Sequence, residues 1–119
     1  MPKVYIVNEG SHDYSDAERY GELVSLSKAG RISRYSPSVI FLNFIEILKD
    51  SKAEDYLLLS GLALVNAIAA GIMSRIHGKI NFLIYHQSKG TYIERNVTFK
   101  VLSGETLGKV LKEAEGDKT

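Results

Sequence analysis

The chain contains no cysteine and no tryptophan, and only two of its 119 residues are proline. Without cysteine it has no disulfide, no thiolate ligand for zinc and no cysteine nucleophile. An excess of one charge is also missing, because 15 lysine and arginine residues balance 14 aspartate and glutamate residues, leaving a net charge of +1. Binding to DNA through counterion release needs a basic surface, so the composition argues against DNA as a partner.

Length and composition predict one globular domain over residues 1–119, with a polar tail from about residue 115. Apolar residues make up 45% of the chain and charged residues 24%, which is the balance of an ordinary folded domain. The first residues do not show the charged start and long apolar stretch of a signal peptide, so we expect none. Residues 56–73 carry no formal charge over 18 residues, but Ser60, Gly61 and Asn66 interrupt them, so we expect no membrane span.

The spacing of apolar residues predicts an α/β fold. Short β-branched and aromatic runs predict strands, and apolar residues at spacings of three and four predict helices. The expected strands are 4–7, 22–26, 55–59, 80–85 and 92–101, and the expected helices are 36–49, 62–76 and 103–114. A capping box at Ser15 and Glu18 predicts a helical turn through Tyr20. We therefore expect a small single-domain sheet of about five strands, with a parallel centre and an antiparallel hairpin edge, packed by two main helices.

The predicted helix 62–76 has almost no polar side chain, and so it lacks a solvent face. Such a helix is buried in a core or in an interface. A chain of 119 residues can hardly surround it, so the pattern predicts a contact between subunits. Ala63, Ala67 and Gly71 form a row of small residues along which another backbone can approach closely.

Ligands of open α/β sheets bind beyond the carboxyl ends of the strands. This rule selects the loops at 8–14, 60–61 and 85–91. The pair Ser60 and Gly61 opens a predicted helix, where free amides and glycine favour an anion. The alternative is that Gly61 only makes a tight turn from strand to helix.

His12 and Asp13 have the residue types of a general base and its orienting carboxylate, but neighbours in an extended chain point to opposite sides. Capping of nearby amides by Asp13 is the alternative. The other histidines, His77 and His86, do not complete a metal-ligand spacing, so we expect no metal. Arginine grips phosphate in a planar, bidentate way, and tyrosine and phenylalanine offer stacking surfaces for a base. Residue type and strand-end position together give the candidate ligand-binding residues Asn8, His12, Arg31, Arg34, Ser60, Gly61, Asn81, Phe82 and Arg95.

Several stretches of the chain form a specific pattern: Val4–Asn8, His12–Tyr14, Ala17, Tyr20–Val24, Lys49–Ser51, Asp55–Tyr56, His77–Asn81 and Tyr92–Arg95. This pattern resembles a family of small phage-encoded proteins, the phage anti-Thoeris sponges of the first described type. The similarity covers roughly residues 4–98 and contains no catalytic signature.

The resemblance implies a protein that is not an enzyme and uses no cofactor. Such proteins capture glycocyclic ADP-ribose made by bacterial TIR-domain enzymes, without cleaving it, and so keep the effector of the defence inactive in the cytoplasm of the infected bacterium. Some also hold cyclic di- or trinucleotide signals. The family assembles as homodimers or larger homo-oligomers, with pockets that two protomers share.

Two other functions stay open on the residues alone. One is a small phosphodiesterase-like enzyme that degrades the same nucleotides with His12 and Asp13. The other is an inhibitor that blocks a host protein through the apolar helix surface.

Overall fold

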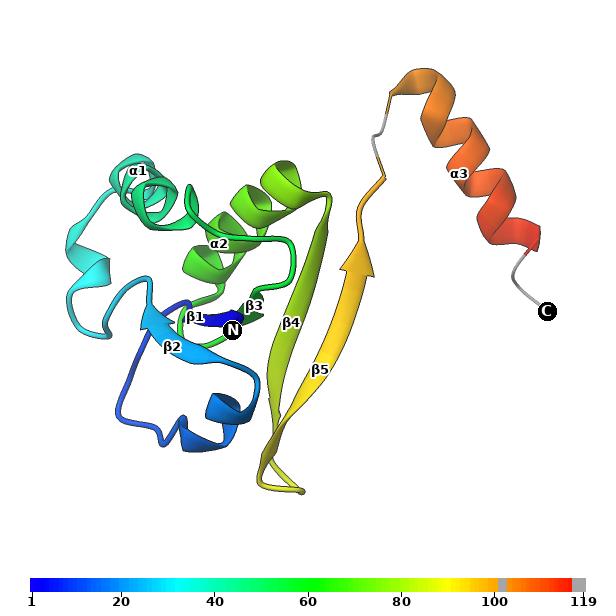
Figure 1. Ribbon diagram of the computed structural model, residues 1–119. Coiled ribbons are helices and arrows are strands. Elements are labelled where there is room, and N and C mark those ends of the chain that lie inside the picture. The colour runs from blue at the N-terminus through cyan, green and yellow to red at the C-terminus, as the bar shows by residue number, and fades with distance from the viewer. Residues whose placement is uncertain (101–102, 117–119) are drawn as a thin grey trace.

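The computed structural model describes residues 1–100 and 103–116 (Figure 1). The strands are β1 (Lys3–Ile6), β2 (Glu22–Ser25), β3 (Tyr56–Leu58), β4 (Lys79–His86) and β5 (Thr91–Thr98). The helices are α1 (Pro37–Leu48), α2 (Ala63–His77) and α3 (Gly104–Gly116), with 3₁₀ turns η1 (Ser15–Arg19) and η2 (Ile32–Arg34). No helix within these ranges is long and apolar enough to cross a membrane.

The five strands form one sheet in the order β2-β1-β3-β4-β5. The strands β2, β1, β3 and β4 run parallel, and β5 pairs with β4 in the antiparallel direction. This confirms the predicted α/β fold with a parallel centre and a hairpin edge. The chain leaves β1 toward β2 and then returns to β3 on the other side of β1, so the strand order reverses between β1 and β3. Crevices at such a reversal are where ligands bind in open α/β sheets.

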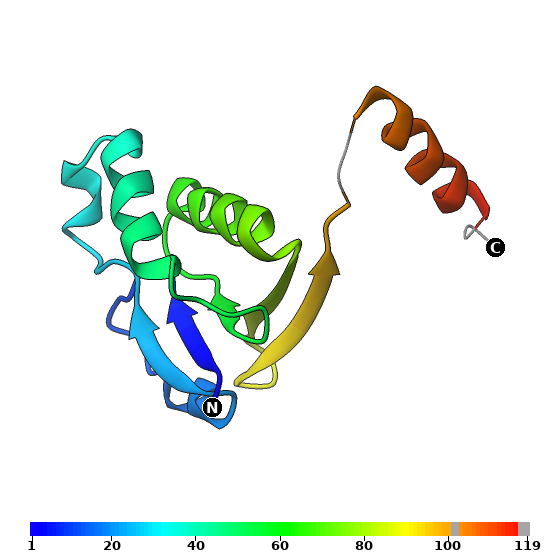
Figure 2. The same ribbon diagram turned by 45° about the horizontal axis from the view of Figure 1, so that its top comes forward.

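Both faces of the sheet are covered. The helices α1 and α2 pack on one face, where Phe44, Leu57 and Met73 are buried together (Figure 2). On the opposite face, the segment between β1 and β2, including η1, buries Ile6 and Ala17. Burial of the central strands on both sides explains why their sequences are apolar at consecutive positions.

The main helices begin and end as their sequences predict. The Ser36 hydroxyl accepts the Val39 amide at 3.3 Å, with Pro37 in the first turn of α1. At the end of α2, Gly78 adopts a φ of +69°, and its amide donates to the carbonyl of Ser74. Glycine reaches this left-handed conformation without strain, so it ends the helix.

The helix α2 buries one face within the chain and leaves the other open. Val65 and Met73 are buried, but Leu64, Ala67 and Gly71 are exposed. Leu64 lies beside exposed Phe41 of α1 and lines a shallow apolar groove with it. The side of α2 that faces away from the sheet is therefore apolar, and in the single chain no residue that the structure describes covers it.

Three smaller expectations differ from the structure. The predicted capping box does not form: Tyr14 is at the N-cap of η1 without a side-chain cap, and the Asp13 carboxylate accepts the Ser15 amide at 2.9 Å. The strand β5 ends at Thr98, and the expected strand end at 101 lies outside the described residues. The helix α3 ends at Gly116, past the expected 114, and it stands apart from the sheet in both views (Figures 1 and 2).

Candidate functional site

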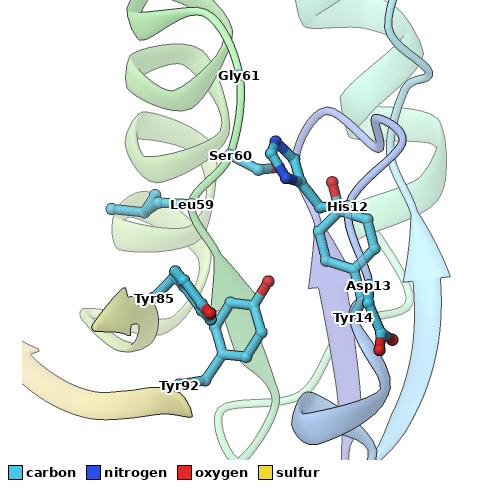
Figure 3. Close-up of a pocket in the computed structure, with 8 residues that line it drawn as sticks. All are labelled: His12, Asp13, Tyr14, Leu59, Ser60, Gly61, Tyr85 and Tyr92. Carbon is cyan, nitrogen blue, oxygen red and sulfur yellow. The ribbon is translucent and has the colours of Figure 1, made fainter. Parts of the chain in front are cut away.

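A pocket of about 290 Å³ opens at the carboxyl ends of β1, β3 and β4, at the reversal of strand order (Figure 3). The loop after β1 contributes His12, Asp13 and Tyr14, the end of β3 contributes Leu59, Ser60 and Gly61, and the β4–β5 hairpin contributes Tyr85 and Tyr92. We call this the aromatic pocket, because four of these eight residues carry aromatic rings.

A pair of reciprocal hydrogen bonds holds the floor of the aromatic pocket. The backbone amide of Asn8 donates to the Ser60 hydroxyl at 3.1 Å, and that hydroxyl donates to the backbone carbonyl of Asn8 at 3.0 Å. Gly61 follows with a φ of +74°. A Cβ at this position would lie 2.8 Å from the Asn8 Cβ, so only glycine lets the two loops approach this closely.

The turn into α2 is held from inside the helix by Asn66. Its side-chain oxygen accepts the Ser60 amide at 3.1 Å, and its side-chain nitrogen donates to the carbonyls of Ser60 at 2.9 Å and Leu62 at 2.8 Å. The Ser60 amide is therefore already used and does not face an incoming anion. An anion at this turn would instead contact the backbone amides of the first turn of α2. The N-cap residue, Leu62, has no polar side chain that could cap these amides.

Aromatic rings form opposite walls of the pocket. Figure 3 shows His12 and Tyr14 on one side and Tyr85 and Tyr92 on the other. The rings of Tyr85 and Tyr92 meet at 5.2 Å and 62°, and those of His12 and Tyr14 meet edge-on at 6.3 Å. The Tyr14 hydroxyl accepts the Gly10 amide at 2.9 Å, which fixes the loop that carries His12. Such walls suit a flat ring inserted between them.

Asp16 and Arg19 of η1 fasten the start of β5 to this wall. The Asp16 carboxylate accepts the Tyr92 amide at 2.7 Å and the Thr91 hydroxyl at 2.6 Å. Arg19 donates to the Tyr92 carbonyl at 2.8 Å. The hydrogen bond from Thr91 is the main reason that the pKa of Asp16 is lowered, and burial raises the pKa of Tyr92 to about 12. Tyr92 therefore stays protonated at neutral pH.

The charge in the aromatic pocket is a single carboxylate, that of Asp13. It accepts the Ser15 amide, and this bond lowers the pKa of Asp13. Figure 3 shows the carboxylate turned away from the ring of His12. The alternative in which Asp13 caps nearby amides is therefore the observed one. Within the described ranges no group of three histidine, aspartate or glutamate side chains is placed to hold a metal ion.

The structure brings four of the candidate residues together. His12, Ser60 and Gly61 line the aromatic pocket, and Asn8 contacts both Ser60 and Gly61. Arg31 lies at the same edge of the sheet but in a second hollow, beside α1. Arg34 is exposed on η2 and is not among the residues that line either hollow.

The structure does not bring the other three candidates to this pocket. Asn81 lies near the start of β4, at the opposite edge of the sheet, where it is buried and donates to the carbonyls of Ala53 and Asp55. Phe82 packs against the core under the helices, and Arg95 faces it from β5. The candidate residues omit Tyr14, Tyr85, Tyr92 and Asn66. Tyr85 and Tyr92 lie close to strand ends, whereas Tyr14 lies well beyond the end of β1 and Asn66 lies within α2.

A family model described as phage Pam3 gp32-like protein matches residues 2–99. The chain belongs to this family. The matched residues include the whole sheet, α1, α2 and every residue that lines the aromatic pocket, and they exclude α3. The phage origin implied by the sequence resemblance is thereby confirmed. Neither a comparison with curated proteins nor one with solved structures gave a match.

Proposed function

We propose that this phage protein is an anti-defence protein that binds glycocyclic ADP-ribose, or a related cyclic nucleotide signal, and sequesters it without cleaving it. The observation that carries the proposal is the aromatic pocket at the reversal of strand order. Its walls are rings from two different parts of the chain, and the phenol of Tyr92 keeps its proton at neutral pH. This combination suits the base and ribose of a nucleotide.

The dimensions of the pocket fit part of such a ligand. A volume of about 290 Å³ is at the small end of the range for small-molecule sites, which runs from about 300 to 1,000 Å³. One base with its sugar fills this space, and the rest of a cyclic dinucleotide-sized ligand extends beyond it. The proposal therefore needs further contacts outside the aromatic pocket.

The arrangement of side chains favours binding over hydrolysis. General acid-base catalysis needs a base held in contact geometry by an orienting group. The carboxylate next to His12 in sequence is engaged with the Ser15 amide, and Tyr92 keeps its proton at neutral pH. The pocket thus supplies surfaces and hydrogen bonds, and the signal leaves it intact, in the cytoplasm of the infected bacterium.

A second copy of the chain is part of this proposal. Phe41 and Leu42 of α1 and Leu64 of α2 are exposed side by side, and no charged residue lines the groove between them. An uncharged apolar face suits an identical face related by a twofold axis, because neither copy has to bury a charge. Leu64 is in the first turn of α2, so such a contact places the second copy near Ser60.

Analysis of the ligand released from the protein tests whether it binds the signal without cleaving it. The protein is mixed with glycocyclic ADP-ribose, filtered to remove free ligand and denatured, and the released molecule is weighed by mass spectrometry. We expect the unaltered ligand in stoichiometric amount, and at least tenfold weaker binding for Tyr85→Ala because a stacking surface is lost. Phe99→Ala removes another exposed aromatic ring, outside the pocket, and the variant should bind the ligand normally. A changed mass would favour the nucleotide-degrading enzyme, and no retention at all would refute the proposal.

Sedimentation tests the second copy. Leu64→Glu places a charge on the apolar face and should yield monomers, whereas Ile84→Glu, at an exposed site on β4, should leave the assembly unchanged. Wild-type protein that sediments as a monomer at the concentration of the binding assay would contradict the shared pocket.

A further inference from the structure

A second hollow, of about 320 Å³, lies between the segment after β2 and α1. Its lining includes Lys28 and Arg31, the hydroxyl of Ser27 and the ring of Tyr35. We call it the cationic hollow, because it holds the positive charges that the lining of the aromatic pocket does not. The two sites have complementary chemistry: rings and one carboxylate in the first, cations and a hydroxyl in the second.

A chain of hydrogen bonds connects the cationic hollow to the aromatic pocket. The Ser27 hydroxyl is 2.6 Å from the Val7 carbonyl and 3.2 Å from the side-chain oxygen of Asn8. Asn8 in turn exchanges two hydrogen bonds with Ser60, which lines the aromatic pocket. A single residue at the end of β1 therefore braces both sites, and their relative positions are fixed.

The two sites lie at the same edge of the sheet but on opposite faces. Tyr14 and Tyr92 of the aromatic pocket pack on the side of η1, whereas Ile32 and Phe44 of the cationic hollow pack on the side of α1. The aromatic pocket is built around the end of β3, the cationic hollow around the end of β2, and β1 lies between them. Neighbouring strands are about 4.8 Å apart, so the two strand ends are about 10 Å apart. A ligand that reaches both sites must therefore pass over the sheet edge at Asn8, and the ribose–diphosphate link of a nucleoside diphosphate lets its base and its phosphates lie on the two sides of that edge.

The two cations differ in their availability. Lys28 is 3.3 Å from Glu9, whose carboxylate also accepts the Ser25 hydroxyl at 2.8 Å, and these partners lower the pKa of Glu9. Arg31 is exposed, and among the described residues no carboxylate lies within ion-pair distance of its guanidinium. A free guanidinium presents a planar set of donors that matches two phosphate oxygens at once.

We propose that the cationic hollow is the diphosphate subsite of the ligand whose base occupies the aromatic pocket, with Arg31 as the principal phosphate contact. This rests on the proposed function, since it presumes a nucleotide in the aromatic pocket. It goes beyond that function by assigning the two halves of the ligand to two sites, and by separating Arg31 from the neighbouring Arg34.

Two probes separate the halves of the ligand. Adenosine carries the base and ribose alone, and ADP-ribose adds the diphosphate. Affinities for both are measured by titration calorimetry, or by competition where adenosine binds weakly, in wild-type protein, Arg31→Ala and Arg34→Ala. We expect Arg31→Ala to weaken the affinity for ADP-ribose by about 10- to 100-fold, because a charge-assisted contact is lost. The affinity for adenosine should not change. Arg34→Ala, which removes the same charge three residues away, should change neither affinity.

The possible results distinguish this proposal from the proposed function. Wild-type protein that binds adenosine and ADP-ribose equally, or an Arg31→Ala variant that retains full affinity for ADP-ribose, overturns the diphosphate subsite and leaves the aromatic pocket in place. Equal losses in Arg31→Ala and Arg34→Ala indicate general attraction by surface charge and also overturn it. Wild-type protein that retains glycocyclic ADP-ribose but binds neither probe overturns the subsite alone, whereas protein that does not retain glycocyclic ADP-ribose refutes the proposed function itself, and the subsite with it.

Discussion

The backbone amide and carbonyl of Asn8 both bind one side-chain atom, the hydroxyl oxygen of Ser60. The two residues follow β1 and β3, the adjacent strands between which the strand order reverses. Here the strands have ended, so the Asn8 backbone needs another partner, and Asn8 is only 5% exposed. A serine hydroxyl serves because it donates and accepts at once. These two hydrogen bonds, which we call the Asn8–Ser60 latch, join the ends of β1 and β3 under the aromatic pocket.

Replacing the Ser60 hydroxyl should lower the stability of the fold. Ser60→Ala leaves the amide and carbonyl of Asn8 without their partner, and we expect a loss of about 1–3 kcal/mol in the free energy of unfolding. Urea denaturation followed by circular dichroism measures this loss. Ser33→Ala, at an exposed site, should stay within about 0.5 kcal/mol of wild type. Equal stability of the two variants would show that the latch contributes nothing.

Gly61 should tolerate no side chain. In Gly61→Ala the new Cβ meets Asn8 and the residue keeps a φ of +74°, so both a steric clash and backbone strain oppose folding. Gly30→Ala serves as the control, because Gly30 has a φ of +87° but open space where its Cβ would stand. We expect about 1–2 kcal/mol of destabilisation for Gly30→Ala, and clearly more for Gly61→Ala. Denaturation midpoints of the two variants separate strain from contact.

The fold could be predicted because its signals are local. Consecutive apolar residues indicate strands that are covered on both faces, as Leu57 and Leu58 of β3 are. Ser36 and Gly78 mark helix ends through cap geometry that depends only on neighbouring residues. The uncovered apolar face of α2 was visible in the sequence as well, since a missing polar face can be read without knowing the packing.

The candidate site was harder to predict, because a residue's place within a strand decides which edge of the sheet it reaches. Asn81 is the third residue of β4 and so lies at the amino edge, away from the pocket. Tyr92 was missed because only the loop at 85–91 was selected, although a strand that runs against its neighbours begins where they end and so places its first residues at the same edge. The contact between Asn66 and the turn before α2 depends on side-chain direction, which periodicity does not reveal.

Acid should loosen the wall of the aromatic pocket through Asp16. The pKa of this carboxyl is lowered in the folded protein, chiefly by the Thr91 hydroxyl, so its stabilising contribution is present above the unfolded pKa of about 3.9 and is lost as pH falls through the folded value. Asp16→Asn should therefore lower the melting temperature at pH 7 and bring it closer to that of wild type near pH 3. Glu18→Gln, on the exposed side of the same turn, is the control. A gap between Asp16→Asn and wild type that does not narrow in acid would contradict the role of the charge.

Tyr92 should titrate well above the range of an ordinary phenol. Burial raises its pKa from about 10 in the unfolded chain to about 12, so the folded state resists ionisation and this residue costs stability as pH rises between the two values. Tyrosinate absorbance near 295 nm should show a late step close to pH 12 that is absent in Tyr92→Phe. The variant should also lose less stability than wild type between pH 10 and 11.5. Tyr35→Phe, at a half-exposed ring, should leave the late step intact. A Tyr92→Phe titration curve that keeps this step would assign it to another residue and would contradict the raised pKa of Tyr92.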